Sequence, residues 1–487
     1  MHINKKIKDI IIVFLIILIS VLFLSYFKIK HQMTFPNLDE LLWMYRSRFF
    51  IDSIFNFNFS NLIQSSQPGI MVMWAIGPFM KILNYDFMSI SNFIANLNNS
   101  GIPYNIINSN DYQIYSNYKE LSFLFNIPIF SVIFLFIFSL YYLLKKLDFN
   151  KWAIIFSLLL IVTTPYYIYF TTPTDKFIGI FSTLSILSLL VYADNKGERK
   201  FLFTSAILCS WAVLTKISTL FLVPFSLVIL AVYSKHYWLH SPAGLWSPFA
   251  KILQLGSTIP LRRELWSQRI NFALRSLSRY RSFGMTKKRM ISSFKNITKD
   301  YFYWLIAFLT TSVIFLPTII TNPRSILNFF TKESSERIIA ASPANYNIFL
   351  NFKIALTYLS DSFMLSFNLF VMVIFIAFIC LIIQRVKSKM KVNKKIAILI
   401  IYCLSFFIFV TLFSKTYSFR YIVPSLIVFQ IVAGIGIYEF SGIIAEKNKT
   451  INKNTVYLWA VIFILLSQAL LIYYSEIKKI EELPHFG

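Results

Sequence analysis

Two adjacent carboxylates follow the first apolar run of the chain, and they are the strongest candidates for acid–base chemistry. Asp39 and Glu40 come just after a Pro-Asn pair, and the residues behind them suit a short interfacial helix. On such a helix Asp39, Trp43 and Arg46 would share one face, because they are spaced by four and three residues. An acid at a helix start often only complements the helix dipole. On the side where substrates arrive, it can instead serve as a general base.

Further charged residues recur at the ends of apolar runs that lie far apart in the sequence. Asp175 and Lys176 close the segment Thr-Thr-Pro-Thr-Asp-Lys. Lys216 ends Leu-Thr-Lys, and Arg420-Tyr421 begins a late apolar run. A single Lys or Arg at a span end usually extends toward the lipid headgroups. Several of them on the side that carries the acids predict a site able to hold a lipid phosphate.

Membrane-spanning helices must position these residues, because the composition excludes a soluble domain. Of the 487 residues, 57% are hydrophobic and 14% charged, whereas soluble domains have roughly 25% charged residues. The hydrophobic share therefore needs lipid as its solvent. The three cysteines, Cys209, Cys380 and Cys403, fall in apolar runs without metal-ligand spacing, so they predict neither a disulfide framework nor a zinc site.

The apolar runs predict an all-α polytopic membrane protein, a single domain over residues 1–487 with about eleven transmembrane helices of about 20 residues each. The first run follows three lysines, as in a secretion signal. It is long and lacks a small-residue cleavage site, so we expect a retained anchor. The expected spans are 10–27, 121–144, 152–170, 177–193, 201–216, 217–234, 301–320, 352–383, 396–414, 419–438 and 456–474.

The basic residues set the expected orientation. With the N-terminus in the cytoplasm, most of the 47 Lys and Arg fall in inner segments, and most acids fall outside. The inner loop 235–300 is the most basic and suits anchoring to anionic lipid. The long outer segments are 28–120 and 321–351; within the first, the stretch 69–83 is apolar but too short to span, so we expect it along the interface.

A net charge of +26 could also indicate nucleic-acid binding. The basic residues, however, lie in short segments between apolar runs, whereas a nucleic-acid binder gathers them on one soluble face. The sequence therefore predicts no nucleic-acid partner. Membrane lipids are the expected partners of these residues.

The motifs, taken in order, resemble the GT-C glycosyltransferases of the phospholipid-carrier-dependent type, which are related to protein O-mannosyltransferases and the lipid A aminoarabinose transferase. The family pattern has His before its Pro-Gly turn, where this chain has Gln67. Gln cannot titrate, so only a positioning role is open to it. The resemblance rests on Asp39-Glu40, Trp43, Arg46-Ser47, Phe49, Pro68-Gly69, Met73-Trp74, an Asp in the next outer loop, Leu-Thr-Lys and Arg-Tyr-x-x-Pro.

The resemblance implies an enzyme that moves a monosaccharide from a polyprenyl-phosphate sugar to an acceptor on the outer face, with inversion at the anomeric carbon. The acceptor would be a hydroxyl of a glycan, lipid or protein, and the membrane the inner (plasma) membrane of a bacterium. Such chemistry needs a base near the hydroxyl and positive charge near the departing phosphate. The implied site has the carboxylates Asp39 and Glu40 as catalytic residues, with Asp39 as the base. Lys216 and Arg420 would bind the phosphate, with Arg46 and Lys176 as weaker candidates, and the supporting residues would be Asp175, Gln67, Trp43 and Tyr421.

A cofactor is not required by these residues. Asp39, Glu40 and Asp175 are carboxylates that could bind a divalent cation, but their spacing does not demand one.

Two other functions stay open. A transporter or flippase of lipid-linked sugars typically shows internal repeats and polar groups at mid-membrane depth. No repeat is evident here, and spans such as 121–144 are nearly free of charge. A polymerase or ligase of pyrophosphate-linked glycans would favour His and Arg in a late outer loop, but 321–351 has Arg and no His.

The charge asymmetry yields the first testable prediction. In a cysteine-free background, Ile270→Cys should be protected from an impermeant thiol reagent added outside intact cells, because loop 235–300 is expected in the cytoplasm. A single cysteine in the segment 321–351 should react under the same conditions. External labelling at residue 270 would reverse the assignment.

Overall fold

The structure of the protein is a computed structural model. It describes residues 38–59, 62, 69–83, 112–162, 173–194, 198–233, 287–324, 374–379, 381–382, 393–413, 423–448 and 450–466. Their regular elements are helices, and these described residues contain no strand. The labelled helices are α2 (Leu38–Phe55), α3 (Ile70–Leu83), α5 (Tyr112–Lys146), α6 (Lys151–Val162), α8 (Pro173–Asp194), α9 (Arg199–Thr215), η3 (Ile217–Phe221), α10 (Leu222–Tyr233), α13 (Lys287–Phe315), α14 (Thr318–Thr321), α18 (Lys394–Phe413) and α19 (Val423–Lys447).

Three helical segments of the described chain are long and apolar enough to cross a membrane: Phe125–Lys146, Thr174–Asp194 and Ser425–Lys447. Shorter apolar helices include α3, α6 and Lys453–Leu466. This composition supports the predicted all-α membrane protein. The expected number of about eleven spans stays a prediction, since span 10–27 lies outside the described residues.

Two boundaries expected from the sequence can be compared with the helices. The division of 201–234 at Lys216 is confirmed, since α9 ends at Thr215 and η3 begins at Ile217. The last part of the expected inner segment 235–300 is helical, since α13 already begins at Lys287. Residues 287–300 contain neither Gly nor Pro, so nothing in this stretch stops the span helix from continuing toward its N-terminus.

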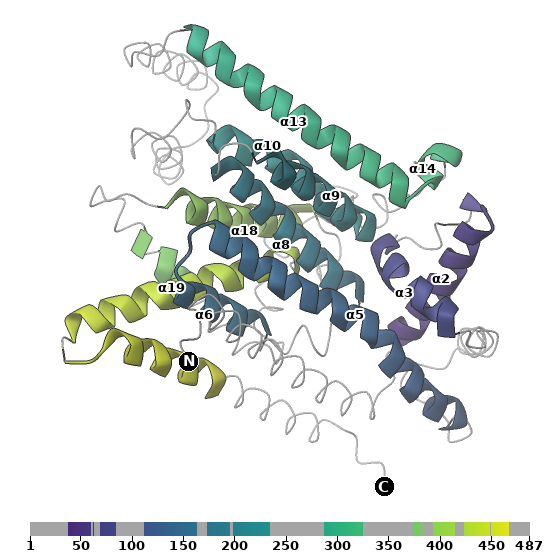
Figure 1. Cartoon of the computed structure of the whole chain (residues 1–487), viewed down its shortest axis with the longest axis horizontal. Helices are drawn as coiled ribbons and strands as arrows, with labels where there is room; N and C mark the ends of the chain where they lie inside the picture. The colour runs from purple at the N-terminus through teal and green to yellow at the C-terminus, as the bar shows by residue number, and fades with distance from the viewer. Residues whose placement is uncertain are drawn as a thin grey trace, which may run out of the picture.

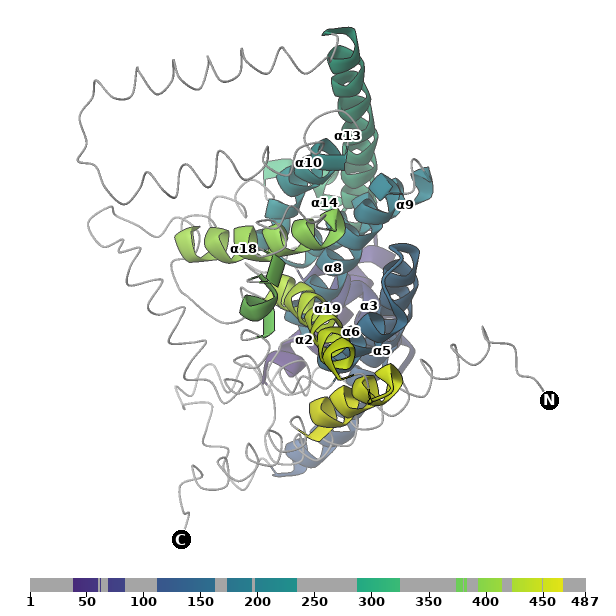
Figure 2. The ribbon, with the colours of Figure 1, turned by 90° about the vertical axis from the view of Figure 1, so that its left-hand side faces the viewer.

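The helices α5, α8, α9 and α13 run in roughly the same direction (Figure 1). The pair α2 and α3 lies at one end of this group, where α3 contacts α5, α8 and α9. The view turned by 90° shows α5, α9 and α13 toward one side of the molecule and α18 toward the other (Figure 2). Helix α8 is surrounded, and its membrane-length segment is 89% buried.

Close backbone contact holds α19 against α6. A Cβ atom on Gly434 would lie 2.4 Å from the backbone nitrogen of Ser157, so only glycine fits there. The Ser157 hydroxyl donates to the carbonyl oxygen of Ile431 at 3.1 Å. Small residues allow helices to approach in this way in membranes, where burial of apolar surface does not drive association between helices.

At the end of the helices away from α2 and α3, one lysine joins three elements. The Nζ atom of Lys395, at the start of α18, lies 2.8 Å from a carboxylate oxygen of Asp194 at the end of α8. It also donates at 2.7 Å to the carbonyl oxygen of Leu147, just after α5. A cation at the C-terminal ends of two helices complements both dipoles.

The α6–α19 contact predicts the effect of a single methyl group. Gly434→Ala should lower the unfolding free energy by about 1–3 kcal/mol, because the added Cβ would overlap Ser157 and push the helices apart. Gly442→Ala in the same helix is the control, since its Cβ would meet only the Tyr457 hydroxyl at 3.8 Å. Thermal unfolding in detergent measures both. Equal midpoints for the two variants would contradict the close contact.

Candidate functional site

A buried ion pair joins the start of α8 to the end of α9. The Nζ atom of Lys216 donates to Oδ1 of Asp175 at 3.1 Å. The two side chains are only 7% and 1% exposed. Lys176, next to Asp175, is also buried. Charged groups withdrawn from water are costly unless they are paired, so such a cluster in an apolar bundle is the first candidate for a functional site.

Local sequence explains why the two charges meet. Pro173 begins α8, where a missing N–H costs nothing, and Asp175 follows in the first turn. Lys216 leaves the helical conformation at the end of α9, with φ −156° and ψ 126°. The acid therefore lies at a helix N-terminus and the cation at a helix C-terminus, so both helix dipoles favour these charges. The Thr219 hydroxyl fixes the break by donating to the carbonyl oxygen of Lys216 at 2.7 Å.

A tight turn attaches the α2–α3 pair beside this ion pair. The backbone N–H of Gly69 donates to the carbonyl oxygen of Thr215, the residue before Lys216, at 3.1 Å. Gly69 has φ +52°, and a Cβ atom there would lie 2.1 Å from the ring of Trp43. The position thus requires glycine for both its backbone angle and its space. Residues from α2, the turn before α3 and the α9 end therefore come together.

The sequence predicts that Asp39, Trp43 and Arg46 share one face of a helix, and α2 can be compared with this prediction at Trp43 and Arg46. The guanidinium of Arg46 lies 5.2 Å from the ring centroid of Trp43, a cation–π distance, so these two residues do share a face. Trp43 is buried, and its carbonyl accepts a hydrogen bond from the Ser47 hydroxyl at 2.6 Å. Asp39 and Glu40 lie in the first turn of α2. Their side chains lie outside the described part of the chain.

The other predicted residues are only partly placed. The structure brings together Trp43, Gly69, Asp175 and Lys216, which are widely separated in sequence. Gln67, Arg420 and Tyr421 lie outside the described residues, so their roles stay predictions. The direct pairing of Lys216 with Asp175 was not predicted, because the sequence places both at one level without indicating which partner each takes.

A run of aromatic rings beside the site was also not predicted from the sequence. The indole nitrogen of Trp74 donates to the carbonyl oxygen of Phe315 at 3.0 Å, which ties α3 to the end of α13. Adjacent rings of the run stand edge to face with centroids 5.4–5.7 Å apart, a favourable aromatic geometry. In the sequence, Trp211 of Trp-Ala-Val-Leu-Thr-Lys could have indicated an aromatic ring near the site, since it lies one helical turn before Thr215. The run is Phe50, Trp74, Phe315, Trp211, Phe181 and Phe177.

A second charge cluster on α2 has a structural explanation. Asp52 accepts from the Nε atom of Arg48 at 2.8 Å and from the Nζ atom of Lys81 in α3 at 3.1 Å. These groups are between 22% and 38% exposed. They join the two helices of the α2–α3 pair, and Asp52 lies more than three helical turns from Asp39 along α2.

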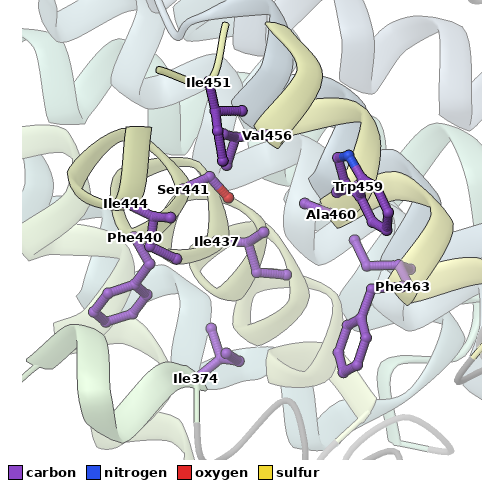
Figure 3. Close-up of a pocket in the computed structure, with 11 residues that line it drawn as sticks. Ile374, Ile437, Phe440, Ser441, Ile444, Ile451, Val456, Trp459, Ala460 and Phe463 are labelled. Atoms are coloured by element: carbon purple, nitrogen blue, oxygen red, sulfur yellow. The ribbon is translucent and has the colours of Figure 1, made fainter. Parts of the chain in front are cut away.

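An open apolar pocket of about 500 Å³ lies along the C-terminal half of α19 (Figure 3). Ile437, Phe440 and Ile444 line it from α19, and Trp459 and Phe463 line it from the following helix. Its lining contains one hydroxyl, from Ser441, and no charged group. A pocket of this kind can hold hydrocarbon, but it offers no acid, base or phosphate-binding group.

Among the described residues, no three His, Cys, Asp or Glu side chains gather as metal ligands. Since the side chains of Asp39 and Glu40 are not among them, the divalent cation stays an untested expectation. The chain matches no model of a known protein family, and comparison with curated proteins gives no match.

The buried pair gives a prediction on stability. Lys216→Met or Asp175→Leu alone should cost about 3–5 kcal/mol of unfolding free energy, because each leaves one buried charge without its partner. The double variant should recover much of this loss, since it removes both members of the Lys216–Asp175 pair together. Thermal unfolding in detergent tests the cycle, with Glu446→Gln as an exposed control that should change little. Strictly additive losses would show that the two groups do not interact.

Proposed function

We propose that the protein is a glycosyltransferase that moves a monosaccharide from a polyprenyl-phosphate sugar to an acceptor hydroxyl on the outer face of the membrane. The observation that carries the proposal is the convergence of four separate sequence motifs around the buried Lys216–Asp175 pair. They are the helix after the first apolar run, the Pro-Gly turn, the Asp-Lys segment and Leu-Thr-Lys. These are the motifs on which the resemblance to the GT-C enzymes rests.

The proposed reaction is a displacement at the anomeric carbon. The acceptor oxygen forms a bond to that carbon while the bond to the phosphate oxygen breaks, and the configuration inverts. Asp39 takes the hydroxyl proton, with Glu40 beside it in the first turn of α2. Polyprenyl phosphate leaves with the electron pair of the broken bond. No redox partner is needed, and the energy comes from the phosphodiester of the donor.

Cations stabilise the charge that develops on the departing phosphate. Lys216 is the best-supported candidate, since Asp175 holds its ammonium group in position at the end of α9. A positioned cation in a site that excludes water stabilises developing charge far better than a solvated one. Arg420 is proposed as the second phosphate ligand. Arg46 and Lys176 are weaker candidates for the same role.

Burial of the ion pair also bears on the alternative of transport. A translocation path needs polar groups that continue across the membrane. In the described chain, the buried ion pair lies at the α2–α3 end of α8 and α9, and the other ion pair of α8, Asp194–Lys395, lies at the opposite end. Between these two pairs α8 carries buried hydroxyls but no charged residue over 177–193. The buried ion pair beside α2 and α3 therefore suits a reaction at one membrane surface.

The catalytic role of Asp39 is testable with a matched control on the same helix. Asp39→Asn keeps the size of the side chain but cannot accept a proton, so transfer should slow by about 10²–10⁴-fold. Asp52→Asn removes a carboxylate that binds Arg48 and Lys81, and it should leave transfer nearly unchanged. The measurement is single-turnover transfer from a purified polyprenyl-phosphate sugar.

Two outcomes are informative. Loss of transfer with unchanged donor binding would support Asp39 as the base, because a helix cap tolerates Asn well. A near-normal rate for Asp39→Asn would reduce Asp39 to a cap, and Asp175 would then be the next carboxylate to test.

A further inference from the structure

Far from the candidate site, five cations are held against aromatic rings on neighbouring helices. Lys145 and Lys146 lie over Tyr141 and Tyr142 near the end of α5, at 5.6 and 6.0 Å from the ring centroids. Lys200 lies 5.2 Å from Phe201 at the start of α9. Arg199 and Lys299 both approach the ring of Tyr303 of α13, at 5.9 and 5.8 Å from its centroid. We call these five cations and their four rings the cationic belt.

The belt is continuous from one helix to the next. Tyr142 of α5 stacks on Phe201 of α9 with centroids 6.3 Å apart. Arg199, two residues before Phe201, reaches Tyr303 of α13. These helices lie toward the same side of the molecule (Figure 2). Five cations from three separate helices thus form one surface at the end of the bundle away from α2 and α3.

Among the described residues, few carboxylates neutralise this surface. Glu198 pairs with Lys200 at 2.7 Å, and the hydrogen bond from Lys200 lowers the pKa of Glu198, so it stays ionised near neutral pH. Asp300 is the carboxylate next to Lys299 in the sequence. The cations therefore outnumber the acids, and the belt keeps a positive charge.

An apolar surface adjoins the belt. On α13 the exposed residues after Lys299 are Phe302, Ile306 and Leu309, which are 45–58% exposed and recur at helical spacing. Leu135 of α5 is 65% exposed. The α5–α9–α13 side thus changes from exposed apolar residues to aromatic rings and then to cations over about three turns of α13. This is the order in which a helix passes from hydrocarbon to headgroups.

We infer that the cationic belt binds acidic phospholipid headgroups at the membrane–water interface, with the adjoining apolar side of α5, α9 and α13 facing the lipid chains. The aromatic rings hold the lysine and arginine side chains in position, so the cations are arranged for a phosphate before a lipid arrives. The inference is independent of the proposed glycosyl transfer, because it uses no residue of the candidate site.

The test is a titration of the full purified chain with phosphatidylglycerol or phosphatidylcholine, followed by native mass spectrometry. The intact chain should retain phosphatidylglycerol in preference. Lys145→Gln with Lys299→Gln should weaken phosphatidylglycerol binding by about tenfold or more, since each surface cation contributes separately. The control pair Lys394→Gln with Lys447→Gln removes the same charge from exposed ends of α18 and α19 and should change binding little.

A second variant tests the rings without changing charge. Tyr303→Leu should weaken phosphatidylglycerol binding by about twofold to fivefold, because two cations lose their aromatic partner. Equal binding of both lipids by the intact chain, or equal losses in the belt and control pairs, would overturn the proposal. Belt-dependent binding of polyglutamate without binding of phosphatidylglycerol would also overturn it and would indicate an acidic protein segment instead.

Discussion

The arrangement around the candidate site depends on one buried ion pair, Lys216–Asp175. Two opposite charges inside an apolar bundle are tolerated only when they stay together, so the pair fixes the start of α8 against the end of α9. Both helix dipoles favour the same placement. The α9 helix must end at Thr215 for Lys216 to turn toward Asp175. The carbonyl oxygen of Thr215 is then available to accept the hydrogen bond from the backbone N–H of Gly69.

Two glycines allow the α2–α3 pair to pack closely around this ion pair. Gly69 lets the ring of Trp43 close over the turn, and Gly77 lets α3 lie against the backbone of α2 at Ser47. Trp43 and Arg46 lie on one face of α2, so the contact of the Trp43 ring with Gly69 holds this face of α2 beside the end of α9. The site thus depends on backbone approach as much as on side-chain chemistry. The function of these residues stays a proposal, carried by their convergence.

The sequence predicts the helical character of the chain and the level of the charged residues, because hydropathy and charge are read directly from residue types. The break at Lys216 was predicted where two short apolar runs meet. The pairing of Lys216 with Asp175 was not, since partner choice depends on which helices are neighbours. The start of α13 at Lys287 was missed because a charged helix extending beyond a span has the same composition as a loop. The roles of Asp39 and Arg420 rest on residue type and order alone.

The central claim is that chemistry, and not passage of a lipid, occurs at the end of the bundle built by α2, α3, α8 and α9. The most direct measurement reconstitutes the purified protein into liposomes with a polyprenyl-phosphate sugar labelled in its sugar and an acceptor outside. The account predicts labelled acceptor and unlabelled polyprenyl phosphate in equal amounts. Movement of the intact labelled donor between leaflets, with no sugar transferred, would contradict it.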